Sequence, residues 1–312
     1  MSTPRPNLFL IGSMKSGTTY LSELLGTHPA VFMSLPKEPT YFVDQQALRR
    51  GWPWMWEQGY WRSEERYLGL FAAAGGAAII GEASTSYTKL PMFTGVVERI
   101  LDFNAQARFV YVMRDPVERT ISHYWHSVNR SSERRPMLGA IQSDPEYTDV
   151  GYYAWQLHEY LQRIDRKQIY VLTFEELLAD PAGQMSRLFA WLGVDPSFRP
   201  SGVGATHVTP AVVDRVRGLG VLNGMRRSSW YRKLEPYVPS AVRKIGSQLA
   251  AESVRPEEID TFEVEAYLRS VLLPQTAELE RLLNRTFPEW TTLYAQPAGD
   301  GETGAVDRDP PG

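Results

Sequence analysis

The stretch Leu8-Phe-Leu-Ile-Gly-Ser-Met-Lys-Ser-Gly-Thr-Thr-Tyr-Leu21 decides the fold class. It opens on a short, continuously apolar run, residues 8–11, which is typical of a strand buried on both faces of a parallel sheet. A glycine-containing turn then leads straight into a helical pattern over residues 17–26. The first turn of such a helix has free N–H groups and the positive end of the helix dipole, which together attract an anion. The stretch therefore predicts an α/β fold with an anion site just beyond its first strand.

Strand and helix patterns alternate along the following part of the chain. Apolar runs at 77–80, 109–113 and 169–173 predict further buried strands, and residues 30–33 predict a shorter one. Helical patterns lie at 94–103, 116–128, 152–163 and 182–192, and a last one runs from about 256 to 283. This alternation is typical of a doubly wound, mainly parallel α/β sheet flanked by helices.

Composition excludes several classes of protein. Hydrophobic residues make up 43% and charged residues 22% of the 312 residues, which is enough apolar material for a packed core. The net charge of −3 argues against a nucleic-acid partner, and the absence of cysteine excludes disulfide scaffolds, thiolate metal sites and cysteine nucleophiles. Since there is no signal-peptide pattern and no apolar run of roughly 18–20 residues, we expect a cytoplasmic protein without a transmembrane segment.

We expect one domain over residues 1–294 and a disordered tail over 295–312, because the tail is rich in Gly, Pro and Asp and has almost nothing to bury. Two insertions, at about 45–75 and 196–250, interrupt the α/β rhythm. The first holds a group of tryptophans: Trp52, Trp54, Trp56 and Trp61.

Both insertions are candidates for the wall of an acceptor site, because aromatic faces suit sugars and phenols. Ordinary packing is the alternative for the tryptophans. The second insertion includes a basic stretch at 226–244, which would face an acidic acceptor, a membrane surface or only solvent.

The turn after the first strand concentrates groups that bind phosphate. Gly12 and Gly17 allow close backbone approach, and Lys15 adds a full positive charge. Hydroxyl donors follow at Ser16, Thr18 and Thr19. An ordinary strand–turn–helix junction with a surface lysine is the structural alternative.

This loop differs from the familiar nucleotide-binding loops. Gly12 and Gly17 have the G-x-x-x-x-G spacing, but Thr18 stands where the triphosphatase loop has its lysine. The strand at 109–113 ends on Arg114 instead of an acid that would hold magnesium, and no G-x-G-x-x-G occurs. The pattern predicts a phosphate-binding loop that lacks the residues needed to hold magnesium and a γ-phosphoryl group.

A second anion site is predicted at the end of the strand at 109–113. Arg114 stands at its carboxyl end, Pro116 opens the next helix in the position that proline prefers, and Ser122 lies about two turns in. Ligands of doubly wound sheets bind beyond the carboxyl ends of the strands, so Lys15 and Arg114 are expected to converge on one crevice. Two phosphate grips without a metal site indicate a nucleotide with phosphates at both ends.

The structural alternative for Arg114 is an ion pair with Asp115 or Glu118. We expect Arg119 to serve that role instead.

With these two motifs, the chain resembles the sulfotransferases that use 3′-phosphoadenosine-5′-phosphosulfate, bacterial members related to the heparan-sulfate type above all. The resemblance spans roughly residues 7–195, with a weaker echo at 282–290. It covers Gly12-Ser-Met-Lys-Ser-Gly-Thr-Thr19, Arg114-Asp-Pro-Val-Glu-Arg-Thr-Ile-Ser122, Gly81-Glu-Ala-Ser-Thr-Ser-Tyr87, Thr173-Phe-Glu-Glu-Leu177 and Phe189-Ala-Trp-Leu-Gly193. One departure is Ala83, where some heparan-type enzymes carry a lysine, and it weakens the case for a polysaccharide acceptor.

The resemblance implies a P-loop-like sulfotransferase fold and a set of donor ligands. Those at the 5′-phosphosulfate are Lys15, Ser16, Gly17, Thr18 and Thr19, and those at the 3′-phosphate are Arg114 and Ser122. No metal is implied, and the nucleotide product is adenosine 3′,5′-bisphosphate.

The resemblance also implies a general base, which sulfuryl transfer to an alcohol needs. Glu38-Pro-Thr-Tyr-Phe42 matches the family's base segment, so we expect Glu38 to be the base and Lys15 to stabilise the leaving phosphate. A salt bridge between Glu38 and Lys37 is the structural alternative. A histidine base, such as His123, stays open, whereas His28 is expected to cap the first helix.

The expected function is therefore metal-independent, in-line transfer of a sulfuryl group to a hydroxyl of a small-molecule or carbohydrate acceptor. An ATP- or GTP-dependent small-molecule kinase and a catalytically inactive nucleotide-binding regulator are the alternatives. The sequence leaves the acceptor, the adenine contacts and the oligomeric state undetermined.

Overall fold

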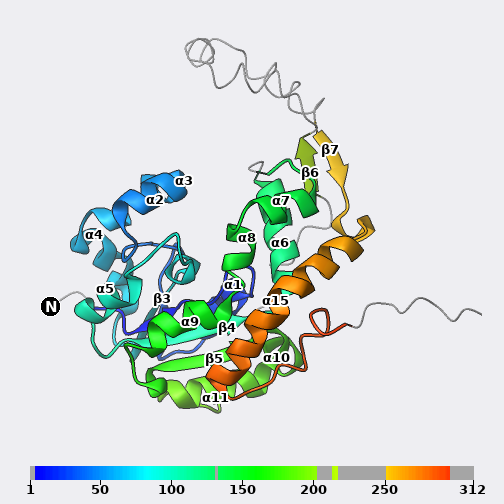
Figure 1. Cartoon of the computed structure of the whole chain (residues 1–312). Helices are drawn as coiled ribbons and strands as arrows, with labels where there is room; N and C mark the ends of the chain where they lie inside the picture. Colours follow the sequence, from blue (N-terminus) through cyan, green and yellow to red (C-terminus); the bar gives the residue numbers. More distant parts are fainter. Residues whose placement is uncertain (1–3, 131–132, 202–212, 217–250, 296–312) are drawn as a thin grey trace, which may run out of the picture.

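The structure is a computed structural model that describes residues 4–130, 133–201, 213–216 and 251–295 (Figure 1). The basic stretch 226–244 and the tail beyond residue 295 lie outside the described residues. In the part of the chain that is described, no helix is both long and apolar enough to cross a membrane.

A five-stranded parallel sheet forms the centre of the fold. Its strands are β1 (Leu8–Leu10), β2 (Val31–Met33), β3 (Ile79–Ala83), β4 (Arg108–Met113) and β5 (Ile169–Thr173), in the spatial order β2-β3-β1-β4-β5. All four neighbouring pairs are parallel. The predicted doubly wound, mainly parallel sheet is confirmed, and the short strand expected at 30–33 belongs to it.

Helices connect and cover these strands. They are α1 (Thr18–Gly26), α2 (Gln45–Gly51), α3 (Pro53–Gln58), α4 (Glu64–Leu68), α5 (Val96–Phe103), α6 (Pro116–Asn129), α7 (Met137–Ser143), α8 (Glu146–Asp149), α9 (Tyr153–Leu161), α10 (Phe174–Ala179), α11 (Pro181–Leu192) and α15 (Phe262–Leu283). Short 3₁₀ turns lie at η1 (Tyr60–Arg62), η2 (Gly69–Ala74), η3 (Thr85–Thr88), η4 (Arg166–Gln168) and η6 (Pro256–Glu258). A separate antiparallel pair consists of β6 (Val213–Val216) and β7 (Ala251–Val254).

The tryptophan-rich insertion folds as the short helices α2 to α4. Caps set their ends: the Asp44 carboxylate accepts from the Ala47 N–H at the start of α2, and the Ser63 hydroxyl accepts from the Arg66 N–H at the start of α4. Helices of this length hold too few turns to show a helical period in the sequence, which is why none was visible.

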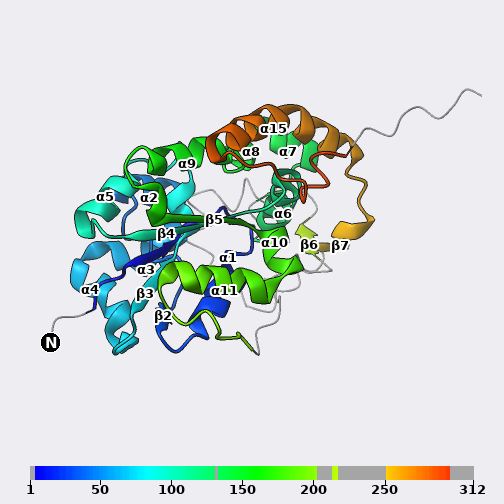
Figure 2. The same cartoon turned by 90° about the horizontal axis from the view of Figure 1, so that it is seen from below.

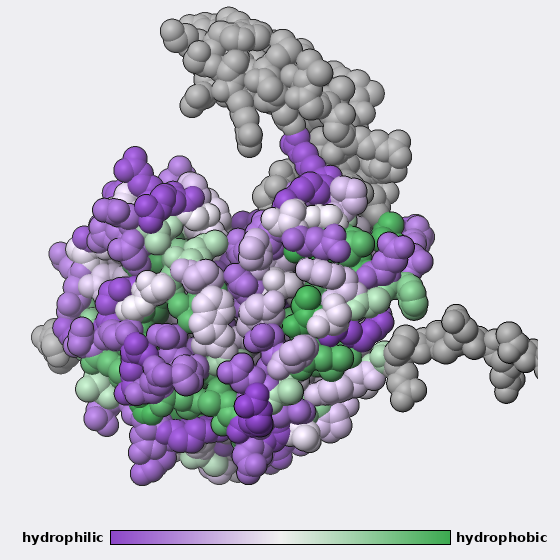
Figure 3. All heavy atoms as spheres, viewed as in Figure 1, coloured by the Kyte–Doolittle hydropathy of each residue, from purple (hydrophilic) through white to green (hydrophobic). Residues whose placement is uncertain are grey.

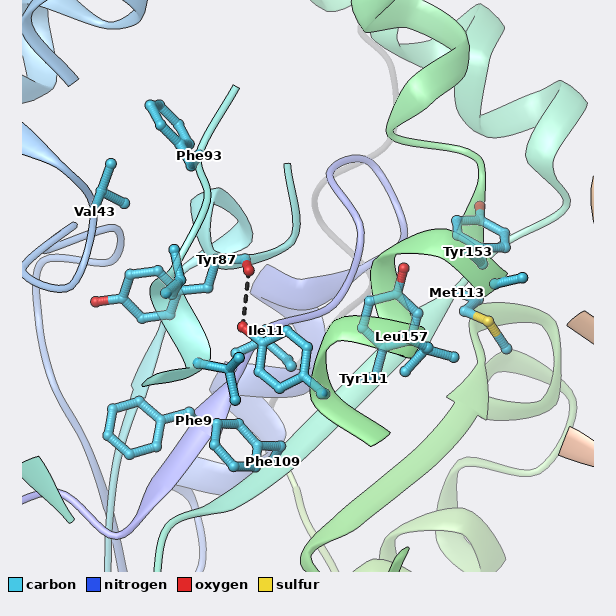
Figure 4. Packing of buried hydrophobic residues seen from close by; sticks show 14 of the residues in the cluster. Phe9, Ile11, Val43, Tyr87, Phe93, Phe109, Tyr111, Met113, Tyr153 and Leu157 are labelled. Atoms are coloured by element: carbon cyan, nitrogen blue, oxygen red, sulfur yellow. Dashed lines mark hydrogen bonds between the residues drawn. The ribbon is translucent and has the colours of Figure 1, made fainter. Parts of the chain in front are cut away.

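The sheet separates two apolar cores, because successive side chains of a strand point to opposite faces. Phe9 and Ile11 belong to one core with Phe109 of β4, and the rings of Phe9 and Phe109 stack with their centroids 5.8 Å apart (Figure 4). Leu8 and Leu10 belong to the other core. Figure 2 shows α1 and α11 on one side of the sheet and α9 and α15 on the other.

The segment after α15 returns to the sheet and joins the helix that follows β4. The Leu293 N–H donates to Oδ2 of Asp115, the residue that caps α6, at 2.9 Å. The Thr173 hydroxyl at the end of β5 donates to Glu289 at 2.9 Å, and Trp290 is fully buried nearby against Tyr153. The carboxyl ends of β4 and β5 are therefore held by residues distant in sequence.

The start of the loop after β1 packs directly on β4. Ser13 N–H donates to the Val112 carbonyl at 3.0 Å, and a Cβ added to Gly12 would lie 2.3 Å from Val112 Cγ1 and 2.6 Å from the Val112 nitrogen. Only a residue without a side chain fits there.

We predict that Gly12→Ala destabilises the protein by about 1–3 kcal/mol, because backbone atoms of β4 cannot move aside as a flexible side chain can. Thermal or urea unfolding measures the change. Gly76→Ala is the matched control, since nothing lies within 4 Å of its added Cβ. Equal stability of the two variants would contradict the packing argument.

Candidate functional site

A cleft of about 920 Å³ lies at the carboxyl ends of the parallel strands. The segment that follows each strand contributes to its lining, with Lys15 after β1, Glu38 after β2, Thr85 after β3, Arg114 after β4 and Phe174 after β5. Figure 3 shows the surface hollowed between the part that carries α2 to α4 and the part that carries α6 to α8. The predicted crevice is confirmed, and Lys15 and Arg114 enter it from the neighbouring strands β1 and β4.

The loop after β1 has the backbone of an anion site. Lys15 and Gly17 adopt left-handed φ angles of 70° and 81°, and α1 begins directly afterwards at Thr18. The N–H groups of the first turn of a helix have no partners within the helix. No side chain caps α1, so these groups can bind an anion. A Cβ added to Gly17 would lie 2.2 Å from the ring of Phe174, so the loop is pressed against the start of α10.

Positive charge is concentrated beside this loop. Burial, together with the charges of Arg114 and Arg130, lowers the pKa of Lys15. An ammonium group that is disfavoured by its surroundings is stabilised when an anion binds next to it. The charge and the free N–H groups therefore both fit a phosphate-like ligand.

The second motif forms the start of α6. Asp115 caps the helix through its carboxylate, and the hydroxyl of Tyr153 donates to the Arg114 carbonyl at 2.7 Å. The Arg114 guanidinium forms an ion pair with Glu118 at 2.6 Å, so the structural alternative for this arginine is present. Ser122 also lines the cleft, two turns into the helix.

The expectation that Arg119 would form that ion pair is wrong. Arg119 is fully buried, and its guanidinium donates to the hydroxyl of Thr120 and the carbonyl of Tyr147. Its hydrogen bond to Tyr147 connects α6 to α8. Arg114 lines the cleft, as does Arg130 just beyond the end of α6.

Glu38 lies in the cleft on a left-handed backbone with φ of 59°. Its Oε1 accepts from the Thr85 N–H at 2.9 Å and from the Thr85 hydroxyl at 2.8 Å. The proposed salt bridge with Lys37 is absent: the Lys37 ammonium donates to the Thr19 hydroxyl at 2.8 Å and to the Thr18 hydroxyl at 3.2 Å. The role of Glu38 as a base stays a prediction.

The histidines differ in position. His123 is buried beside the ring of Tyr147, and its burial and the neighbouring cations hold its pKa well below the ordinary value. His126 lies one turn along α6, and burial together with Lys15 and Arg130 lowers its pKa to about 4. His28 lies just beyond α1, where its ring accepts from the Ala30 N–H and packs on Phe189.

Several charged lining residues were not recognised in the sequence, among them Lys37, Lys89, Glu146 and Arg130. Lys37 follows β2 and contacts α1. Lys89 is buried, pairs with Glu146 at 2.8 Å and lies 4.0 Å from the ring centroid of Trp52. Isolated lysines and a lone glutamate give no periodic or motif signal, and only the folded chain brings them together.

The tryptophans divide between the two roles considered for them. Trp52 and Trp54 line the cleft, and the Arg130 guanidinium lies 4.9 Å from the ring centroid of Trp54. Trp56 and Trp61 stack on each other at 3.7 Å and do not line it. Among the described residues, no group of three or more His, Asp and Glu side chains is arranged to hold a metal ion.

We predict that His126 titrates at about pH 4 in the free protein and at a higher pH when adenosine 3′,5′-bisphosphate is bound, because the anion offsets the charges of Lys15 and Arg130. Histidine NMR resonances measure both values, with His158 on α9 as the internal control. Since the folded pKa lies below the ordinary 6.5, His126 also makes the protein lose stability as the pH falls from about 6.5 to about 4. An unchanged His126 titration at saturating nucleotide would contradict the placement of the anion.

Comparisons with known proteins point to one family of enzymes. A sequence model described as the Sulfotransferase family matches residues 6–199. Heparan sulfate glucosamine 3-O-sulfotransferase 3B1 of Homo sapiens is 26% identical over 198 residues, which are 61% of this chain and 46% of that protein. The membrane-associated sulfotransferase kil1 of Dictyostelium discoideum is 34% identical over 123 residues, 39% of this chain and 23% of that one.

The fold also has a solved counterpart. The crystal structure of a sulfotransferase from Alicyclobacillus acidocaldarius superposes with a TM-score of 0.65 at 24% identity, over 92% of this chain and 99% of that one. The chain spans about half the length of the curated heparan sulfate enzymes that it matches.

Proposed function

This chain belongs to the sulfotransferase family, and we propose that it transfers a sulfuryl group from 3′-phosphoadenosine-5′-phosphosulfate to a hydroxyl of a small-molecule or carbohydrate acceptor. One observation carries the proposal. Two anion-binding positions, the loop with Lys15 and the start of α6 with Arg114, open into one cleft from neighbouring strands. A nucleotide with phosphates at both ends is complementary to that arrangement.

The residues present fit this donor. The free N–H groups at the start of α1 and the partly buried ammonium of Lys15 suit the 5′-phosphosulfate, and the glycine at position 17 leaves room only for backbone. Gly17, Thr18 and Thr19 line the cleft and would complete that end, and Arg114 and Ser122 would hold the 3′-phosphate. Ser16 is fully buried, does not line the cleft, and donates its N–H to the Ser13 carbonyl, so its expected part in donor binding stays a prediction. The bound donor supplies a sulfuryl group activated by a phosphate leaving group.

The roles of the protein groups follow from their charges. Glu38 accepts the proton of the acceptor hydroxyl as that oxygen attacks. Its carboxylate is held by the N–H and hydroxyl of Thr85, so it does not need to reorganise during the reaction. Lys15 stabilises the negative charge that develops on the leaving phosphate, and the transfer is an in-line displacement that requires no metal.

We propose that the acceptor binds between Glu38 and the wall formed by Trp52 and Trp54, since all three residues line the cleft. The heparan sulfate relatives act, by their names, on glucosamine in heparan sulfate. We extend to this chain the broader class of hydroxyl-bearing acceptors, because Ala83 departs from the lysine of some heparan-type enzymes.

The donor is tested first by calorimetric titration with adenosine 3′,5′-bisphosphate, beside ATP with magnesium. Tight binding of the bisphosphate without magnesium supports the donor site, and a screen of hydroxyl acceptors follows. Preference for ATP with magnesium would favour a small-molecule kinase. Bisphosphate binding without turnover of any acceptor would favour a nucleotide-binding regulator.

We predict that Arg114→Ala weakens binding of adenosine 3′,5′-bisphosphate by about tenfold to a hundredfold and leaves adenosine 5′-phosphate almost unaffected, because a charge-assisted hydrogen bond to the 3′-phosphate is lost. Calorimetry with both nucleotides measures the difference. Arg187→Ala, which removes an exposed arginine paired with Asp180, is the control. An equal loss of affinity for both nucleotides would refute the assignment of Arg114 to the 3′-phosphate.

We predict that Glu38→Gln lowers kcat by about a hundredfold or more and leaves nucleotide affinity nearly unchanged, because the amide keeps the shape and loses the basicity. The exposed residue Glu278 on α15 provides the control variant Glu278→Gln. Unaltered turnover in Glu38→Gln would move the base elsewhere, with His123 and His126 the next residues to replace.

A further inference from the structure

Lys37 occupies an unusual position for a lysine. It lies at the positive, amino-terminal end of α1, where its ammonium donates hydrogen bonds to the hydroxyls of Thr18 and Thr19. Helix dipoles disfavour a cation at this end and favour an anion. The side chain is partly buried and lines the same cleft as Lys15.

The charged neighbours of Lys37 offset its burial only in part. Burial lowers the pKa of Lys37 most, and the charges of Glu38 and Glu23 raise it by less. The Glu38 carboxylate is held by Thr85, and the left-handed backbone of Glu38 sends the two adjacent side chains to different elements. Lys37 turns to α1, and Glu38 turns to the segment after β3.

The hydrogen bonds of Lys37 also fix what the threonine hydroxyls can do. A lysine ammonium only donates, so the oxygens of Thr18 and Thr19 both act as acceptors toward it. The hydroxyl hydrogens of both threonines are then left to donate to another group. At the amino-terminal end of a helix, beside Lys15, the complementary group is an anionic oxygen.

We propose that Lys37 is a second cation of the 5′-anion site, where it binds the phosphosulfate end of the donor and orients the Thr18 and Thr19 hydroxyls as donors toward it. This inference rests on the proposed function and adds a residue to it. Lys37 lies in the segment after β2 and Lys15 in the loop after β1. The two cations that would bind the anion therefore follow strands that are not adjacent in the sheet.

The test compares nucleotides that carry only one of the two phosphates. We expect Lys37→Met to weaken binding of adenosine 5′-phosphate and adenosine 3′,5′-bisphosphate by about tenfold or more, and to leave adenosine 3′-phosphate unchanged. Arg114→Ala is expected to weaken binding of adenosine 3′-phosphate and of the bisphosphate, and to leave adenosine 5′-phosphate almost unaffected. Lys37→Arg, which keeps the charge, should retain most of the 5′-phosphate affinity.

Two controls separate this role from a loss of folding or of general charge. Lys167→Gln removes an exposed lysine outside the cleft. The thermal midpoint of the nucleotide-free Lys37→Met protein should not fall, because a methionine has no charge to desolvate.

The inference is overturned if Lys37→Met binds adenosine 5′-phosphate as tightly as the unaltered protein does. It is also overturned if the variant loses affinity for adenosine 3′-phosphate to the same extent as for adenosine 5′-phosphate. If the unaltered protein binds adenosine 5′-phosphate and the bisphosphate equally, the donor proposal fails, and Lys37 is still judged with the 5′-phosphate. Binding of neither nucleotide by the unaltered protein overturns both.

Discussion

Parallel pairing of β1 with both β3 and β4 is the constraint on which the rest of the structure depends. Leu8 is in register with Gly81 on one side and with Arg108 on the other, so the carboxyl ends of these strands lie at one edge. Five loops consequently open into one cleft, although their residues are far apart in the sequence. A parallel sheet thus brings chemistry together that no local stretch contains.

The electrostatics of this edge favour anions. Lys15, Lys37 and Arg114 lie near the amino-terminal ends of α1 and α6, and burial lowers the pKa of both lysines. Carboxylates balance part of the charge, with Glu118 on Arg114 and Glu146 on Lys89. The positive charge that remains at this edge favours the binding of an anion.

The parts predictable from the sequence were those written in contiguous motifs. The continuous apolar run at residues 8–11 indicated a parallel strand, and the glycine, lysine and hydroxyl residues after it indicated the anion loop. The ion pair of Arg114 with Glu118 was among the alternatives that the sequence offered, because the two residues are four positions apart. The contacts of Lys37 and Lys89 depend on which side chains meet after folding, so no local pattern contained them. The same holds for Arg119, whose burial between α6 and α8 prevents the ion pair expected for it.

The hydrogen bond from Leu293 to Asp115 has a consequence for the order of events during biosynthesis. The two residues are 178 positions apart, so the cap of α6 gains this partner only long after Arg114 has left the ribosome. At about 5–20 residues per second, that interval is on the order of 10 to 35 s. Before it ends, the strands β1 to β5 have all been made, while the start of α6 at Arg114 still lacks this contact. The start of α6 therefore receives the last of its supporting contacts only when nearly all of the described chain has been made.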